Sequence, residues 1–87
     1  MTPRDEHIER CKAALVRRQA KMDALYAAVD YPGMTEHECA LAAINSPWFD
    51  LCKHQDRARK WLIILLRKRG TADDLSLAQA IQWTAWP

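Results

Sequence analysis

The sequence predicts an all-α protein, either a small three- to four-helix bundle or a small orthogonal helical domain. In two long segments, about residues 3–29 and 47–69, apolar side chains recur at steps of three and four residues, the spacing of one helix face. Helix-capping residues stand at the ends of these segments, and no segment alternates as a strand does. A length of 87 residues fits one helical domain spanning residues 1–87.

The first helix is expected to begin at Thr2-Pro3, a hydroxyl cap followed by proline at the first helical position. Arg18 interrupts its apolar face, so we expect this side chain either to reach out to solvent or to pair with a carboxylate inside the core. The other positions of that face are apolar: Ile8, Cys11, Leu15, Met22, Leu25 and Val29.

A turn at residues 31–34, with proline and glycine at its centre, separates this helix from a short second one. Thr35 and Glu38 have the spacing of a capping box at the start of the second helix, and Asn45 ends it. Ser46-Pro47 opens the next helix almost at once. The second and third helices should therefore meet at a tight corner.

The third helix is expected to run from Pro47 to about Arg69 and to stop at Gly70. One broad face is apolar and carries Trp48, Leu51, Cys52, Ala58, Trp61, Leu62, Leu65 and Leu66. The opposite face is basic and carries Lys53, Arg57, Lys60, Arg67 and Lys68. Ile64 lies within the basic face, so it should be covered by another element, another subunit or a partner.

A short fourth helix should begin at Thr71, with two acidic residues in its first turn. Leu75, Ala78, Ile81 and Trp83 are expected to face inward. Trp48 and Trp61 are also expected to fill the core. Trp86 lies next to the last residue, so it should either dock on the body of the protein or be offered to a partner.

Charge is segregated along the chain although the net charge is only +2. Residues 1–21 and 53–69 are strongly basic and hold all 13 Lys and Arg, whereas residues 22–52 hold five acids and no Lys or Arg. One interpretation is that basic and acidic segments pack together and neutralise each other locally. The alternative is that the third helix presents a basic stripe to an acidic partner.

No pattern in the sequence indicates catalysis, a cofactor or a metal site. His37 and Cys39, like Cys52 and His54, are two residues apart, and such residues point in different directions on a helix. No nucleophile stands beside a base and an orienting group, and the two isolated glycines form no phosphate-binding loop. We therefore expect a protein that is not an enzyme, without metal or cofactor, whose three cysteines remain thiols.

The N-terminus becomes charged at once, unlike a signal peptide, and the longest apolar run covers only residues 61–66. These features favour a cytoplasmic protein without a membrane role. The second and third helices could imitate a helix-turn-helix, but Trp48, Phe49 and Asp50 occupy the positions that would read bases. Nucleic-acid binding would then involve only the phosphate backbone and the basic face.

The leading hypothesis is a non-catalytic protein-interaction module whose partner is another protein with an acidic surface. High Ala and Arg content with short loops is typical of small bacterial or phage accessory proteins, among which an inhibitor needs only a binding surface. The long first helix could instead supply a homodimer seam. Nucleic-acid backbone binding is the second choice. The expected partner-binding residues are Lys53, Arg57, Lys60, Ile64, Arg67, Lys68 and Trp86.

Overall fold

The computed structural model describes residues 2–29, 33–83 and 85–87, and these contain four helices and no strand, which confirms the all-α prediction. The helices are α1 (Pro3–Val29), α2 (Glu36–Ile44), α3 (Pro47–Arg69) and α4 (Ala72–Gln82). Residues 31 and 32 of the predicted turn lie outside the described residues. Gly33, which follows them, has a φ of 91°, a value that favours glycine.

The helices begin and end where their capping residues predict. The hydroxyls of Thr35, Ser46 and Thr71 accept hydrogen bonds from backbone N–H groups in the first turns of α2, α3 and α4. At the end of α3, Gly70 adopts a left-handed φ of 72° and donates its N–H to the carbonyl of Leu66 at 2.8 Å. Only Asn45 and Ser46 separate α2 from α3, as expected for a tight corner.

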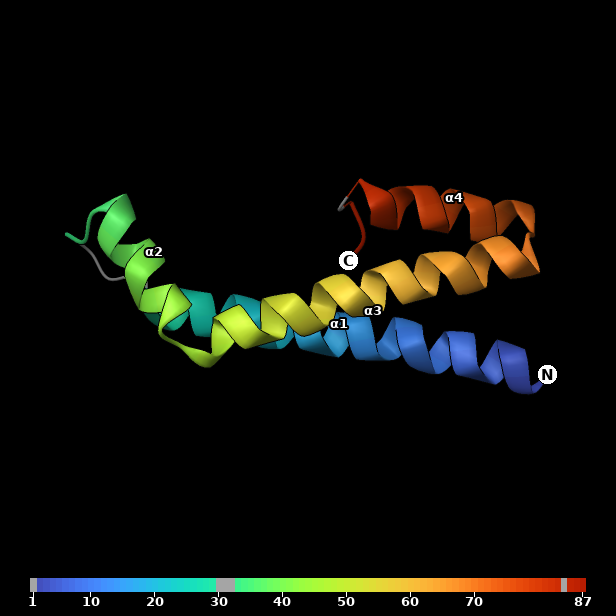
Figure 1. The fold of residues 1–87 in the computed structure, drawn as a ribbon, viewed down its shortest axis with the longest axis horizontal. Coiled ribbons are helices and arrows are strands. Elements are labelled where there is room, and N and C mark those ends of the chain that lie inside the picture. The colour runs from blue at the N-terminus through green and yellow to red at the C-terminus, as the bar shows by residue number, and fades with distance from the viewer. Residues whose placement is uncertain (1, 30–32, 84) are drawn as a thin grey trace.

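The four helices form an elongated molecule with dimensions of 49 × 21 × 16 Å. Figure 1 shows α1 and α3 running side by side in opposite directions over most of this length. At the end that holds the N-terminus, α4 folds back along α3, and α2 lies at the opposite end. Because α3 contacts each of the other three helices, it is the element on which the molecule is assembled.

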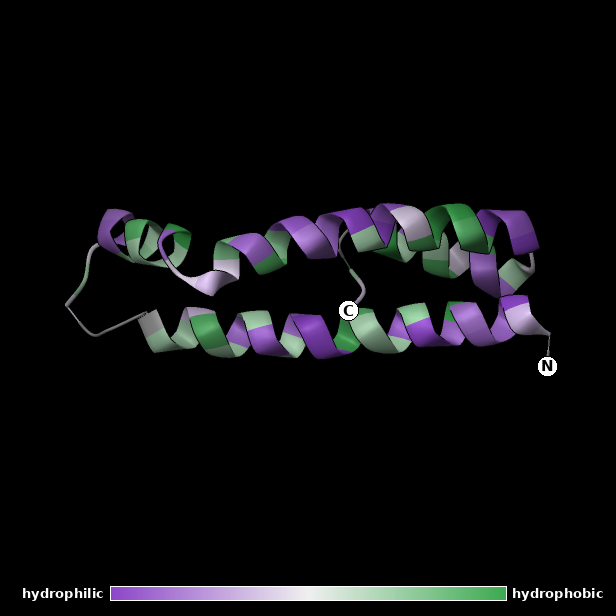
Figure 2. Ribbon diagram, turned by 60° about the horizontal axis from the view of Figure 1, so that its bottom comes forward, coloured by the Kyte–Doolittle hydropathy of each residue, from purple (hydrophilic) through white to green (hydrophobic). Residues whose placement is uncertain are grey.

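The main core lies where α1, α3 and α4 meet. In Figure 2 hydrophobic and hydrophilic residues alternate along the ribbons of these helices, as expected for helices that each have one apolar face. The fully buried members are Ile8, Leu15, Leu62, Leu66, Ala78 and Ile81. Met22, Cys39 and Ala43 are buried outside this cluster, toward the α2 end, where less apolar surface is covered. The side chain of Val29, the last predicted member of the α1 face, is outside the described part of the structure.

Arg18 was expected either to reach out to solvent or to pair with a carboxylate, and in the structure it instead meets an amide. Its Nη1 donates a hydrogen bond to Oε1 of Gln55 at 2.9 Å, and Gln55 is only 1% exposed. The amide nitrogen of Gln55 in turn donates to the backbone carbonyl of Leu15 at 2.8 Å. The two long helices thus each place a polar residue on their apolar face, and these residues satisfy each other across the interface.

Three predicted core residues lie at the surface instead. Trp61 is 50% exposed, Leu75 is 50% exposed and Trp83 is 72% exposed. In α4 the buried face contains Asp74, Ala78 and Ile81, and Leu75 is rotated about 100° from Asp74 on the helix. The prediction was wrong for Leu75 because an aspartate, Asp74, occupies the inward position one residue earlier.

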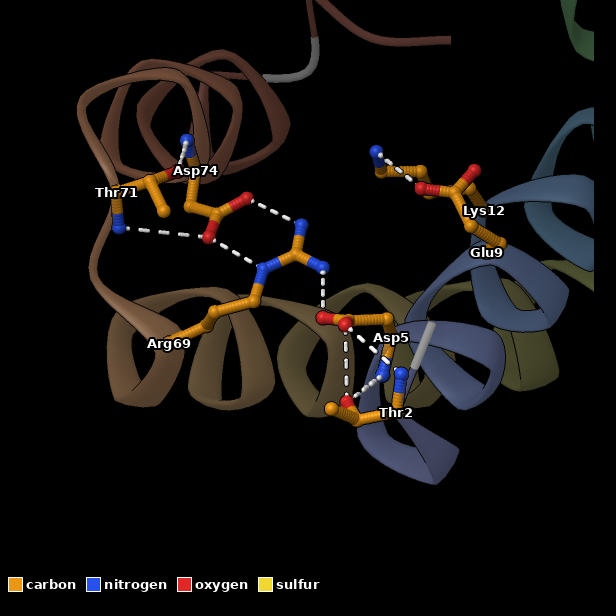
Figure 3. A network of polar contacts seen from close by, with 7 residues as sticks. All are labelled: Thr2, Asp5, Glu9, Lys12, Arg69, Thr71 and Asp74. Carbon is orange, nitrogen blue, oxygen red and sulfur yellow. Dashed lines mark hydrogen bonds and ion pairs between the residues drawn. The ribbon is translucent and has the colours of Figure 1, made fainter.

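Arg69 explains why an aspartate is buried there (Figure 3). Its Nε and Nη2 donate to the two carboxylate oxygens of Asp74, each at 2.6 Å, and its Nη1 donates to Oδ1 of Asp5 at 2.9 Å. These hydrogen bonds hold the pKa of Asp74 well below its usual range and also lower the pKa of Asp5. One guanidinium therefore joins α1, α3 and α4 at the end that holds the N-terminus.

Candidate protein-interaction surfaces

The basic residues predicted on the third helix lie on the outer side of α3. We call this surface the basic stripe and define it as Lys53, Arg57, Lys60, Ile64, Arg67 and Lys68. Every member is exposed, and Ile64 retains 46% of its surface. The stripe lies on the side of α3 away from its buried residues, Gln55, Leu62 and Leu66. Ile64 was expected to be covered by another element, another subunit or a partner. In the described structure no other element of the chain covers it.

Two lysines of the stripe make contacts on the surface. The ammonium of Lys60 lies 3.0 Å from the carboxylate of Asp56, one turn away, and both side chains are more than 60% exposed. The ammonium of Lys53 lies 4.5 Å from the ring centroid of Phe49. An exposed ion pair of this kind adds little to stability. Arg67 reaches another helix, because its Nη2 donates to Oε1 of Gln82 on α4 at 3.1 Å. Among the described contacts, the other charges of the stripe are not used to hold the helices together.

Trp61 was expected in the core, but it lies at the border of the basic stripe. It lies one turn from Arg57 and from Ile64 on α3. Its indole Nε1 lies 3.5 Å from Nε2 of His7 on α1. A half-exposed tryptophan beside a half-exposed isoleucine gives the basic stripe an apolar margin, which the helical spacing alone did not indicate.

Trp86 docks on the body of the protein, which was one of the two alternatives expected for it. This side chain is half-buried and packs against the main core cluster. Trp83 is the more exposed of the two tryptophans near the C-terminus. Trp86 therefore contributes to the packing of the C-terminal segment, and the part of it that remains accessible is smaller than that of Trp61.

The antiparallel arrangement of α1 and α3 gathers like charges at one end of the molecule (Figure 1). The basic part of α1 lies beside the basic part of α3, and together they hold all 13 Lys and Arg. The other end, residues 22–29 and 33–52, holds four acids: Asp23, Glu36, Glu38 and Asp50. Asp30 lies outside the described residues.

In the described structure, the predicted neutralisation between basic and acidic segments occurs only where Arg69 pairs with Asp74, at the end that holds the N-terminus. Among the described residues, ion pairs between different helices involve only Arg69, with Asp5 and with Asp74. None reaches the acidic segment of residues 22–52. The molecule is therefore a rod with a positively charged end and a negatively charged end.

The members of the two closely spaced His and Cys pairs differ in burial. Cys39 is buried whereas His37 is exposed, and Cys52 is half-buried whereas His54 is exposed. Sγ of Cys11 lies 3.8 Å from Nε2 of His7, but burial raises the pKa of the Cys11 thiol and so disfavours the thiolate. In the part of the chain that the structure describes, no group of three or more His, Cys, Asp or Glu residues could hold a metal ion.

Sequence reasoning missed a second surface, at the acidic end. A hollow of about 360 Å³ opens there between α1, α2 and α3. Its lining is almost wholly apolar and consists of Tyr26, Ala40, Ala43, Ile44, Trp48, Phe49 and Cys52. Ile44 is 50% exposed at this hollow. The high apolar content of the short second helix could have indicated an exposed apolar surface there. The hollow itself depends on the angle at which α2 meets the two long helices.

Comparison of the chain with protein-family models, with curated proteins and with solved structures found no match. Over the described residues, every helix is too short or too polar to cross a membrane.

Proposed function

We propose that this protein is a non-catalytic interaction module that binds the acidic surface of another protein through the basic stripe of α3. The observation that carries the proposal is Ile64, which is 46% exposed among five cations on a helix face that nothing in the described chain covers. Binding surfaces commonly combine an apolar anchor with a polar rim, and Ile64 with the cations around it would supply these two parts.

Trp61 supports the same surface. Tryptophan is enriched among the residues that dominate binding energy, and Trp61 offers half of its surface next to Ile64. The cations around this pair would steer an acidic partner toward the stripe and set its orientation. A module of this kind acts by occupying its partner's surface, as a small bacterial or phage accessory or inhibitor protein in the cytoplasm would.

The decisive experiment is a pull-down from a bacterial lysate with the tagged protein and two matched variants. Ile64→Asp places a carboxylate at the centre of the stripe, and Leu75→Asp places the same group on α4, at a site that is similarly exposed (50%). We expect one stoichiometric protein to remain bound to the wild type and to Leu75→Asp after nuclease treatment at moderate salt. The same protein should be lost from Ile64→Asp. A protein that Ile64→Asp retains equally well would contradict the proposal.

Binding to a nucleic-acid backbone is the second candidate, and it is favoured by the collection of all 13 Lys and Arg at one end. In that case nucleic acid alone would be recovered, nuclease would remove it, and the affinity would fall steeply with salt. Lys60→Glu should then weaken binding strongly, whereas Ile64→Asp should act only through its added charge. A protein partner held by an apolar anchor should instead survive moderate salt.

A further inference from the structure

The acidic end of the molecule carries two neighbouring hollows with different chemistry. The first is the apolar hollow of about 360 Å³ between α1, α2 and α3. The second, of about 390 Å³, lies along α1 and α3 and contains the carboxylate of Asp23 and the amide of Gln19. Tyr26 and Trp48 line both hollows, so the two are adjacent. Their rings have centroids 5.5 Å apart and are inclined at 53° to each other.

The apolar hollow has the composition of a receptor for one apolar side chain. Ile44 is 50% exposed, Tyr26 is 40% exposed and Phe49 is 38% exposed, although all three adjoin the hollow. The small side chains of Ala40 and Ala43 leave space between these larger ones. A side chain such as leucine that entered here would remove apolar surface from water on every side.

The neighbouring hollow indicates the charge of the occupant. The carboxylate of Asp23 accepts a hydrogen bond from Nε2 of Gln19 at 3.0 Å, and Oε1 of the same amide accepts one from Nη2 of Arg59 at 3.1 Å. Arg59 is thus bound to the amide, and Asp23 makes no ion pair with it or with any other described cation. The acidic end of the chain, residues 22–52, contains no Lys or Arg at all. The rings of Tyr26 and Trp48 also favour a cation, because an aromatic face attracts positive charge. The complement of this hollow is therefore a lysine or arginine side chain.

We propose that the acidic end is a second docking site, which binds a peptide segment that carries an apolar anchor close to a Lys or Arg. The anchor fills the apolar hollow, and the cation lies over the Tyr26–Trp48 pair next to Asp23. Lys53 is the nearest stripe cation along the chain, and it is engaged over the ring of Phe49. This site goes beyond the proposed function, since it uses the opposite end of the molecule and a partner of the opposite charge.

The test uses two fluorescein-labelled dodecapeptides that contain the same single leucine, flanked by lysines in one and by glutamates in the other. Binding to the full-length protein is measured by fluorescence polarisation at physiological ionic strength. We expect the lysine peptide to bind about tenfold more tightly than the glutamate peptide, a difference of about 1.4 kcal/mol. Asp23→Asn should weaken the lysine peptide about two- to fivefold, the range for a partly exposed ion pair. Asp23→Lys should reverse the preference.

Three variants separate this site from the basic stripe. Ile44→Asp should weaken the lysine peptide by at least about tenfold, because it places a carboxylate in an apolar hollow. Ile44→Ala, which keeps the site apolar, should weaken it less and serves if the aspartate variant loses its helical circular dichroism. Ile64→Asp changes a residue of similar exposure at the other end and should leave peptide binding unchanged, whereas it removes the partner of the proposed function.

Two results would overturn the inference. One is equal or absent binding of the two peptides to the wild-type protein. The other is unchanged binding of the lysine peptide by both Ile44→Ala and Asp23→Asn, which would place the peptide elsewhere. Neither result bears on Ile64, so a failure of the docking site and a failure of the basic stripe are distinguishable.

Discussion

The hydrogen bond between Arg18 and Gln55 gives a quantitative prediction about the interface of α1 and α3. In Arg18→Leu, the Oε1 of Gln55 loses its only described donor while the residue stays 1% exposed. A buried acceptor without a partner costs about 1–3 kcal/mol. The new leucine occupies a half-buried position and returns about 1 kcal/mol of apolar burial at most. We therefore expect Arg18→Leu to lower the free energy of unfolding by about 1–2 kcal/mol.

The reverse single variant should cost less. In Gln55→Leu, the half-buried guanidinium of Arg18 can turn to water, and the Leu15 carbonyl keeps its place in the hydrogen bonding of α1. We expect a loss of about 1 kcal/mol or less. The double variant Arg18→Leu/Gln55→Leu leaves neither group unsatisfied and should be close to the wild type or more stable. The two substitutions should therefore couple by about 1–3 kcal/mol.

Urea and thermal unfolding followed by far-ultraviolet circular dichroism measure this cycle directly. For a domain of this size, Arg18→Leu should lower Tm by about 5–10 °C, and the double variant should recover most of that loss. Additive effects of the two substitutions would refute the reasoning, because they would show that the amide and the guanidinium do not depend on each other. The same conclusion would follow if Arg18→Leu alone were as stable as the wild type.

Two further predictions concern the end where α3 turns into α4. Because Arg69 depresses the pKa of Asp74 in the folded state, the contribution of Asp74 to stability should be present above about pH 4 and should decline steadily as the pH is lowered from about 4 to about 2. Asp74→Asn should lower Tm by about 5–10 °C at pH 7 and flatten the dependence of urea unfolding on pH in this range; an unchanged slope would contradict the pairing. Gly70→Ala should lower the free energy of unfolding by about 1 kcal/mol, since φ is 72° there, and equal urea midpoints would show that α3 ends differently.

The ends of the helices were predictable because they are determined locally. A hydroxyl at Ser46 and a proline at position 47 specify a helix start through groups only two residues apart, and Gly70 specifies an end in the same way. The exposure of the basic stripe was predictable for a related reason. Five cations on one side of a helix cannot all be buried, whatever lies on its other side.

The positions that the sequence did not predict depend on how the helices approach one another. Trp61 lies at the edge of the apolar face of α3, and the direction from which α1 packs decides whether it is covered. Gln55 and Asp74 are polar residues at inward positions, and each is buried because an arginine on another helix reaches it: Arg18 on α1 for Gln55, and Arg69 at the end of α3 for Asp74. The hollow at the acidic end requires three helices at once, so no single periodicity could indicate it.

The separation of charge along a rod 49 Å long has a consequence for how the protein behaves in different buffers. At physiological ionic strength the screening length is about 8 Å, so the two ends are electrostatically independent, and the net charge of +2 describes neither of them. Near neutral pH the protein should be retained by cation-exchange and by anion-exchange resins alike. At about 0.01 M salt the screening length rises to about 30 Å, and each molecule then becomes a long-range dipole that attracts its neighbours end to end. Desalting, which usually keeps like-charged proteins apart, should bring these molecules together.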